Sequence, residues 1–316
     1  MANTSFQKIF QTLLVLWIVS VATFWFLKLA PGDPVTLLLG AEYSPEAHAR
    51  LTKDLGLDQP LVVQYLKWMG NFVQGDWGRS YITRADIFQL AVLQALPITL
   101  WLSALALIFA LALGVPAGMI AALKRGGPVD WCVSSLSVLG SAFPSFYLGI
   151  ILIWVFGVGL GWFPTMGFVR PWEDFVGGLH HLALPAMTLG LYYAGLISIT
   201  TRASLIEVMN QPFISAVRAR GEPMYRVVCV HAMRNVLMPL VTVIGLQLGG
   251  LLRGAVMTEV VFAVPGLGMM ITTAVLSREY AVVQAGIILT ALFFIIVNLL
   301  VDQAYQFLDP RLRKRA

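Results

Sequence analysis

Residues 87–123 read IFQLAVLQALPITLWLSALALIFALALGVPAGMIAAL and contain no Asp, Glu, Lys or Arg. Two further windows share this property, one between Trp131 and Val169 and one between Phe175 and Thr201. Each window exceeds the roughly 20 apolar residues that a helix needs to cross about 30 Å of hydrocarbon. A soluble core does not need three such windows. The sequence therefore predicts an integral membrane protein with several spans.

The composition of the whole chain supports this interpretation. The 316 residues are 58% hydrophobic and 12% charged, against about 25% charged residues in soluble domains. The net charge of +5 comes from short loops between apolar segments, so it indicates membrane topology and not nucleic-acid binding. Cys132 and Cys229 lie far apart without metal-like spacing, which predicts two free thiols. No cofactor and no metal site are predicted.

The apolar segments predict an all-α fold with about six transmembrane helices, and Pro144 predicts a kink in the third. The stretch Val260–Ser277 is uncharged, but Pro265 interrupts it near its start. We expect a loop with a short helix there, at the outer membrane surface or dipping into it, and not a seventh span. The six expected spans are approximately Ile9–Leu29, Ile98–Leu123, Trp131–Leu160, Leu182–Ala203, Val236–Met257 and Val282–Tyr305.

The distribution of charge predicts the orientation in the membrane. Six spans place both termini on one side, and that side carries an excess of Lys and Arg over acids. The positive-inside rule makes both termini cytoplasmic. Residues 1–96 are then an N-terminal transmembrane helix with a periplasmic segment. Residues 97–316 are a core domain with five spans and a cytoplasmic loop at about 204–235.

This predicted cytoplasmic loop has the pattern of two helices separated by a glycine. Pro212 suits the first turn of a helix, and Gly221 suits a left-handed helix end. Helical spacing puts four residues on one face: Phe213, Ala216, Val217 and Arg220. The other face carries Ser215, Arg218 and Glu222. An apolar ridge with a basic flank fits a groove in a partner protein, and a solvated loop that obeys the positive-inside rule is the alternative.

Ionisable residues inside spans are candidates for a substrate path, because they are costly in hydrocarbon. Arg253 lies near the outer end of the fifth span, close in sequence to Glu259. It could attract a carboxylate that enters a pore, but it could also snorkel to the interface or pair with Glu259. Asp302 is explained by an interfacial position. His180 and His181 have no further His or Cys nearby, so an outer loop explains them better than metal binding.

Several stretches of the chain resemble one family. The loop is similar to the "EAA" loop of bacterial ABC importer permeases, with Ala216, Gly221 and Pro239 at matching positions. It is closer to the dipeptide, oligopeptide and nickel branch, above all to the B-type subunit of dipeptide permeases. The quoted motifs are LAPGDPV (29–35), LGLDQPLVVQY (55–65), GDWGRSY (75–81), VRARG (217–221), HAMRNVLMPL (231–240), TEVVFAVPGLG (258–268), REYAVVQ (278–284) and LDPRLR (308–313). Ser215 stands where the general pattern has its first glutamate, so Arg218 or Arg220 could carry the polar contact.

The resemblance implies a type I ABC importer permease in the bacterial inner membrane, importing dipeptides or oligopeptides. It implies three kinds of protein partner: cytoplasmic ATPase subunits, a second and paralogous permease, and a periplasmic substrate-binding protein. The ATPase-coupling residues would be Phe213, Ala216, Val217, Arg218, Arg220 and Gly221. No lysine follows a glycine, so a phosphate-binding loop is absent and a non-catalytic subunit is expected.

Two alternatives stay open from the sequence. The same fold could import nickel, glutathione or small oligosaccharides, because the soluble binding protein sets most of the specificity. A channel or membrane enzyme that needs no ATPase is the alternative of a different class.

Overall fold

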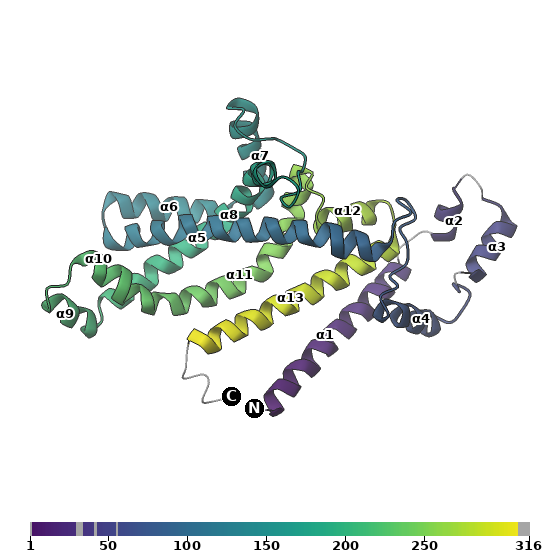
Figure 1. The fold of residues 1–316 in the computed structure, drawn as a ribbon, viewed down its shortest axis with the longest axis horizontal. Coiled ribbons are helices and arrows are strands. Elements are labelled where there is room, and N and C mark those ends of the chain that lie inside the picture. Colours follow the sequence, from purple (N-terminus) through teal and green to yellow (C-terminus); the bar gives the residue numbers. More distant parts are fainter. Residues whose placement is uncertain (1, 30–33, 41–42, 55, 309–316) are drawn as a thin grey trace. The chain divides into compact units, whose positions relative to one another are not determined.

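The computed structural model describes residues 2–29, 34–40, 43–54 and 56–308, and Figure 1 shows their fold. Across these residues the secondary structure is helical, apart from one isolated bridge between Arg79 and Asp86. The chain forms an all-α protein, as predicted. The α-helices are α1 (Ala2–Leu29), α2 (Pro34–Leu39), α3 (Pro45–Asp54), α4 (Leu61–Val73), α5 (Leu96–Leu123), α6 (Pro128–Ala142), α7 (Ser145–Leu152), α8 (Phe175–Met209), α9 (Pro212–Ala219), α10 (Met224–Arg226), α11 (Met233–Phe262), α12 (Leu267–Leu276) and α13 (Tyr280–Leu308).

In the described part of the chain, three π-helical turns extend these helices. They are η2 (Gln89–Ala95), η3 (Ile153–Gly159) and η4 (Val227–Ala232). η2 continues into α5, and η4 joins α10 to α11, so that single helices run over Gln89–Leu123 and Met224–Phe262. π-turns inside helices are uncommon and are frequent at functional sites. The hydrophobic pattern gave no sign of them.

Four helices in the described part of the chain are long and apolar enough to cross a membrane. They are Gln89–Leu123, Phe175–Met209, Met224–Phe262 and Tyr280–Val301. α6 followed by α7 and η3 makes a fifth apolar segment, bent by 108° at its break. α1 contributes a shorter apolar stretch, Phe10–Phe26. These segments agree with the predicted number of about six.

The bend at Pro144 is much larger than the predicted kink. Phe143 has an extended backbone, with φ −80° and ψ 137°, and it ends α6. A proline ring disfavours helical geometry in the residue before it, which explains this end. Pro116, Pro185 and Pro239, in contrast, lie inside α5, α8 and α11. The third predicted span is therefore two helices and not one kinked helix.

The uncharged stretch after α11 is not a seventh span, as predicted. α11 ends at Phe262, and Ala263 adopts a left-handed conformation with φ 53°. The following helix α12 has ten residues and is about 15 Å long, half of the hydrocarbon thickness. Its position relative to the membrane surface stays a prediction.

The chain folds into two compact units. One contains the residues up to Pro97 together with Gly266–Phe293, and the other contains Ile98–Pro265 and the chain from Phe294 onward. The predicted division at 96/97 does not anticipate this grouping of 266–293 with the N-terminal part, and it stays a prediction about sequence domains.

In the first unit, a buried acid fixes the turn before η2. Glu279, which is 7% exposed, accepts hydrogen bonds from the Ser80 hydroxyl and the Ile82 backbone N–H, both at 2.8 Å. Aromatic rings fill the space around α4: Phe24, Tyr65, Trp68, Phe72 and Trp77.

In the second unit, α8 is the central helix of the core. Its glycines allow close approach: a Cβ atom on Gly195 would lie 2.3 Å from the backbone oxygen of Ser137 in α6. On α5, a Cβ atom on Gly118 would lie 2.4 Å from the backbone oxygen of Ser198 in α8. Small residues at such contacts are typical of helix packing in membranes. α5, α6 and α8 are therefore in backbone-to-backbone contact.

Candidate functional site

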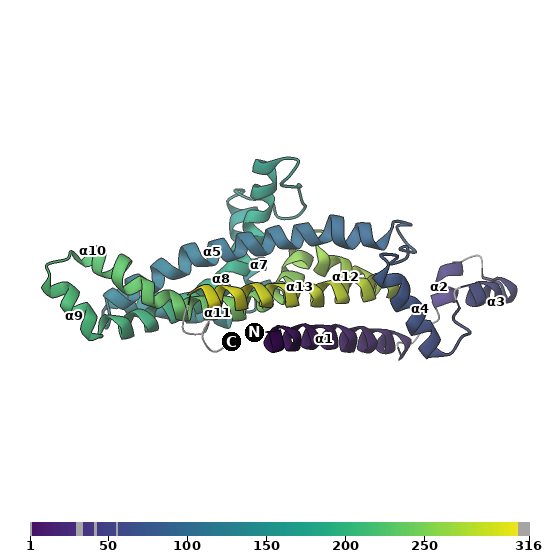
Figure 2. The ribbon, with the colours of Figure 1, turned by 60° about the horizontal axis from the view of Figure 1, so that its bottom comes forward.

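The connection between α8 and α11 forms the predicted helix–glycine–helix element. Pro212 occupies the first turn of α9, preceded by Gln211 in an extended conformation. Gly221 follows the helix with φ +80°, the left-handed conformation expected for it. α10 and η4 then lead into α11. In both ribbon views, α9 and α10 lie beyond the ends of α8 and α11 (Figures 1 and 2).

One side of α9 is fixed to the rest of the unit. Ile214 is 0% and Val217 is 4% exposed, and both belong to the main hydrophobic core. The same core contains residues from the end of α8 and from η4: Leu205, Val208, Val227 and Val228. α9 is thus packed against its own chain through an apolar contact and does not hang as a free loop.

The positions of α9 other than Ile214 and Val217 are exposed, and so is Arg220 after it. This exposed face carries Phe213, with 38% of its surface accessible, together with Ala216, Arg218 and Arg220. The predicted apolar ridge needs one correction, because Val217 faces the core and is not available to a partner. The helical spacing placed Val217 beside Phe213, but it could not show that Ile214 and Val217 form the inner face.

The charges around α9 are partly paired within the chain. Glu222 and Arg226 form an ion pair at 3.6 Å, four residues apart. Arg218 and Arg220 form no ion pair with any residue that the structure describes. The exposed face of α9 is therefore apolar at Phe213 and basic at its C-terminal end.

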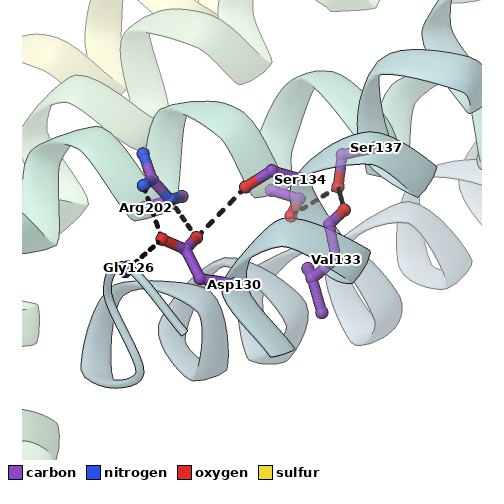
Figure 3. Close-up of polar contacts among 7 residues, drawn as sticks. Gly126, Asp130, Val133, Ser134, Ser137 and Arg202 are labelled. Carbon is purple, nitrogen blue, oxygen red and sulfur yellow. Dashed lines mark hydrogen bonds and ion pairs between the residues drawn. The ribbon is translucent and has the colours of Figure 1, made fainter. Parts of the chain in front are cut away.

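An ion pair connects the start of α6 to α8, as Figure 3 shows. The Arg202 guanidinium donates from Nε to Asp130 Oδ1 at 2.6 Å and from Nη2 to Oδ2 at 2.8 Å. The Gly126 backbone N–H and the Ser134 hydroxyl also donate to this carboxylate, at 2.9 and 3.2 Å. Asp130 is 4% exposed. A bidentate pair of this kind fixes both position and orientation.

The sequence interpretation missed this pair. Arg202 lies at the end of the predicted span Leu182–Ala203 and received no role, and neither did Asp130. A signal was present, because each is an isolated ionisable residue at the border of a charge-free window, on the same predicted side of the membrane. Two such residues of opposite sign are candidates for a pair.

The structure separates the two residues predicted for the substrate path. Glu259 is 0% exposed and accepts a hydrogen bond from the Thr99 hydroxyl of α5 at 2.6 Å. Arg253 is exposed and forms no ion pair with any described residue. The alternative in which Arg253 pairs with Glu259 is therefore not observed.

Arg253 lies at a pocket of about 240 Å³ in the second unit. Three elements line it: the first residue of α7, the middle of α8, and α11. The lining residues are Ser145, Leu189, Tyr192, Tyr193, Gln247, Gly250, Arg253 and Gly254. The pocket is thus bordered by one cation and several neutral polar side chains.

The adjacent histidines have ordinary partners. His180 Nε2 lies 2.8 Å from the Trp162 carbonyl oxygen, and His181 Nδ1 lies 2.9 Å from that of Gly177. Within the described ranges, no group of three or more His, Cys, Asp or Glu side chains could hold a metal ion.

Comparison with known sequences matches two family models along the chain. Residues 114–314 match the binding-protein-dependent transport system inner membrane component, and residues 1–103 match the N-terminal part of the membrane component of binding-protein-dependent transport systems. The di/tripeptide transport system permease protein DppB of Pseudomonas aeruginosa is 41% identical, with 93% of this chain and 94% of that protein covered. The glutathione transport system permease protein GsiC of Escherichia coli is 38% identical, with 99% of both chains covered.

A putative peptide transport system permease protein of Brucella abortus is 39% identical, covering 97% of this chain and 98% of that protein. Among solved structures, a chain of the inward-facing MetNI methionine ABC transporter has a similar fold, with a TM-score of 0.59 and 18% identity. The match covers 69% of this chain and 96% of that chain. At this identity the likeness concerns the fold, which is that of a type I ABC importer permease. This multi-pass chain therefore belongs to the family of inner-membrane components of binding-protein-dependent transport systems and is a permease subunit.

Proposed function

We propose that this chain is a non-catalytic subunit of an ATP-driven importer that carries dipeptides or oligopeptides delivered by a periplasmic binding protein. The observation that carries this proposal is the similarity over nearly the whole chain to permeases named for peptide and di/tripeptide transport. Glutathione is the second candidate cargo, because a glutathione permease is 38% identical.

The proposed complex contains cytoplasmic ATPase subunits and a second, paralogous permease. The exposed face of α9 is the proposed contact with an ATPase, through Phe213, Ala216, Arg218 and Arg220. Val217 has a different proposed role, since it anchors α9 together with Ile214. Both termini are proposed to be cytoplasmic, which puts α9 on the ATPase side; the basic segment 311–315 lies outside the described residues.

The packing around α9 supports a role in transmitting movement. A helix fixed by a buried apolar contact transmits displacement, whereas a flexible loop absorbs it. α9 packs on η4, and η4 is continuous with α11. The Asp130–Arg202 ion pair fixes the nearby part of α8 to α6. A push on α9 would therefore reach several spans, as a switch between two states of the partner requires.

Reconstitution in proteoliposomes with the ATPase, the second permease and the binding protein tests the function. We expect uptake of mixed dipeptides that needs all four components and ATP. Uptake by this chain without an ATPase would indicate the channel alternative. Uptake of nickel or an oligosaccharide with no dipeptide uptake would contradict the proposed cargo.

Gly221 offers a matched pair of variants for the coupling element. Its φ of +80° disfavours other residues, although no atom lies within 4 Å of a Cβ built there. Gly221→Val should strain the turn by about 1–2 kcal/mol and lower ATP-dependent uptake several-fold. Gly221→Asn should stay close to wild type, because asparagine tolerates this conformation. Equal, unchanged uptake in both variants, together with unchanged pull-down of the ATPase, would contradict the coupling role.

A further inference from the structure

The pocket at Arg253 contains a positive charge that forms no ion pair with any described residue. Arg253 lies within a helix long and apolar enough to span the membrane, and a charged side chain inside a span costs free energy. No carboxylate among the described residues offsets this cost with an ion pair. Such residues generally face a water-filled cavity or a ligand.

Close packing of α8 against α11 places a tyrosine hydroxyl at this pocket. A Cβ atom on Gly250 would lie 2.9 Å from the Tyr193 hydroxyl oxygen, and one on Gly254 would lie 2.7 Å from Leu189 Cδ1. These two glycines therefore let α8 approach α11 with the tyrosine hydroxyl beside the pocket. The Tyr193 ring is 4% exposed and packs edge-on against Tyr192, with centroids 5.0 Å apart. The hydroxyl is thus held by a buried ring.

The donors around the pocket favour an anion over a metal cation or a neutral sugar. Arg253 supplies a permanent positive charge, and Gln247, Tyr193 and Ser145 supply neutral hydrogen-bonding groups. A guanidinium repels a bare cation such as Ni²⁺ but matches a carboxylate geometrically. The volume of about 240 Å³ is below the roughly 300–1,000 Å³ of sites that enclose a drug-sized ligand. The pocket therefore suits one end of a ligand.

We infer that this pocket binds the C-terminal carboxylate of a peptide in transit, with Arg253 as the anionic contact. The inference rests on the proposed peptide function and assigns a subsite to it. Tyr193 and Gln247 orient the carboxylate, and the open side leaves room for peptides of different length. The same chemistry accepts glutathione, which carries carboxylates, but it excludes nickel as the cargo bound at this subsite.

Uptake by the complete transporter in proteoliposomes tests this inference, with dipeptides of neutral side chains as the probe so that the C-terminal carboxylate is their only carboxylate. At saturating binding protein, Arg253→Gln should lower uptake about tenfold or more, and Arg253→Lys should retain part of it. Arg170→Gln is the matched control, because Arg170 is an exposed arginine paired with Glu173. ATP hydrolysis stimulated by the binding protein should stay within about twofold in all three variants, since coupling is untouched.

Thiol labelling gives a second measurement that a merely structural role would not produce. In a Cys132→Ser, Cys229→Ser background, Arg253→Cys should react with a charged thiol reagent if water fills the pocket. Absence of labelling would place Arg253 against lipid or protein and overturn the inference. Wild-type uptake in Arg253→Gln, or a parallel loss of uptake and ATP hydrolysis, would overturn it as well. If the wild-type transporter carries another cargo but no dipeptide, the proposed function fails instead.

Discussion

Arg202 and Arg253 lie in long apolar helices of the same compact unit, but their environments are opposite. Arg202 makes a bidentate ion pair with Asp130, and two further donors complete the carboxylate. Arg253 is exposed at a pocket and has no ion pair among the described residues. A charge in a span can therefore serve the fold or be kept available for a ligand. Its local partners distinguish the two cases, and hydropathy does not.

The largest expected difference comes from removing each arginine in turn. Arg202→Met leaves the buried Asp130 without its countercharge and should lower the apparent unfolding midpoint of the purified transporter by about 5 °C or more. Arg253→Met removes no ion pair and should leave the midpoint within about 2 °C or raise it, because functional sites often reduce stability. Thermal unfolding in detergent measures both.

Asp130→Asn is the control for the Asp130–Arg202 ion pair. It keeps groups that can hydrogen bond to Gly126 and Ser134 but loses the charge, so its midpoint should fall between those of the wild type and Arg202→Met. Equal midpoints for Arg202→Met and Arg253→Met would contradict the claim that Arg202 stabilises the fold and Arg253 does not.

A smaller effect is expected from adding a methyl group where α11 packs against Tyr193 at the pocket. In Gly250→Ala, the added methyl group would lie 2.9 Å from the Tyr193 hydroxyl oxygen. We expect dipeptide uptake to fall a few-fold while the ATPase remains bound, because the subsite narrows and the coupling element does not change. Gly70→Ala is the matched control, since a Cβ atom there meets nothing within 4 Å. Undiminished uptake in Gly250→Ala would show that the pocket is dispensable.

The smallest expected change in the unfolding midpoint comes from the serines near the Asp130–Arg202 ion pair. Ser134→Ala removes only a 3.2 Å hydrogen bond to Asp130 and should cost less than about 1 kcal/mol. Ser137→Ala should cost more, because its hydroxyl is buried between the Val133 carbonyl at 2.8 Å and the Ser198 hydroxyl at 2.9 Å. Midpoints from the same unfolding assay compare the two. The reverse order would mean that the Asp130 site depends on its weakest donor.

Much of the fold could be predicted from the sequence, because long segments without charged residues indicate helices that cross the hydrocarbon of the membrane. The helix end at Gly221 and the helix start at Pro212 were also predictable, since both depend on the conformational limits of single residues. The size of the bend at Pro144 was not, because Pro116, Pro185 and Pro239 carry the same local signal and lie inside helices.

The candidate sites were less predictable than the fold. Asp130 and Arg202 are 72 residues apart. Each stands at the border of a charge-free window, but the sequence alone does not show that the two side chains are in contact. Val217 is buried in the core that also contains residues of η4. The helical spacing within α9 does not show which of its residues face η4. Arg253 was recognisable as an unusual charge, but the glycines and tyrosines that form its pocket were visible only after α8 and α11 were packed.

The close packing of α8 also has a consequence for the amplitude of motion. α8 is one helix of 35 residues, about 52 Å long, and glycine contacts hold it directly against α5 and α6. A rod of this length that tilts by about 5° about one end displaces its other end by about 4–5 Å. Backbones in contact leave little room for the helices to move independently. A small tilt at the α9 end of this bundle would therefore produce a larger displacement at its opposite end.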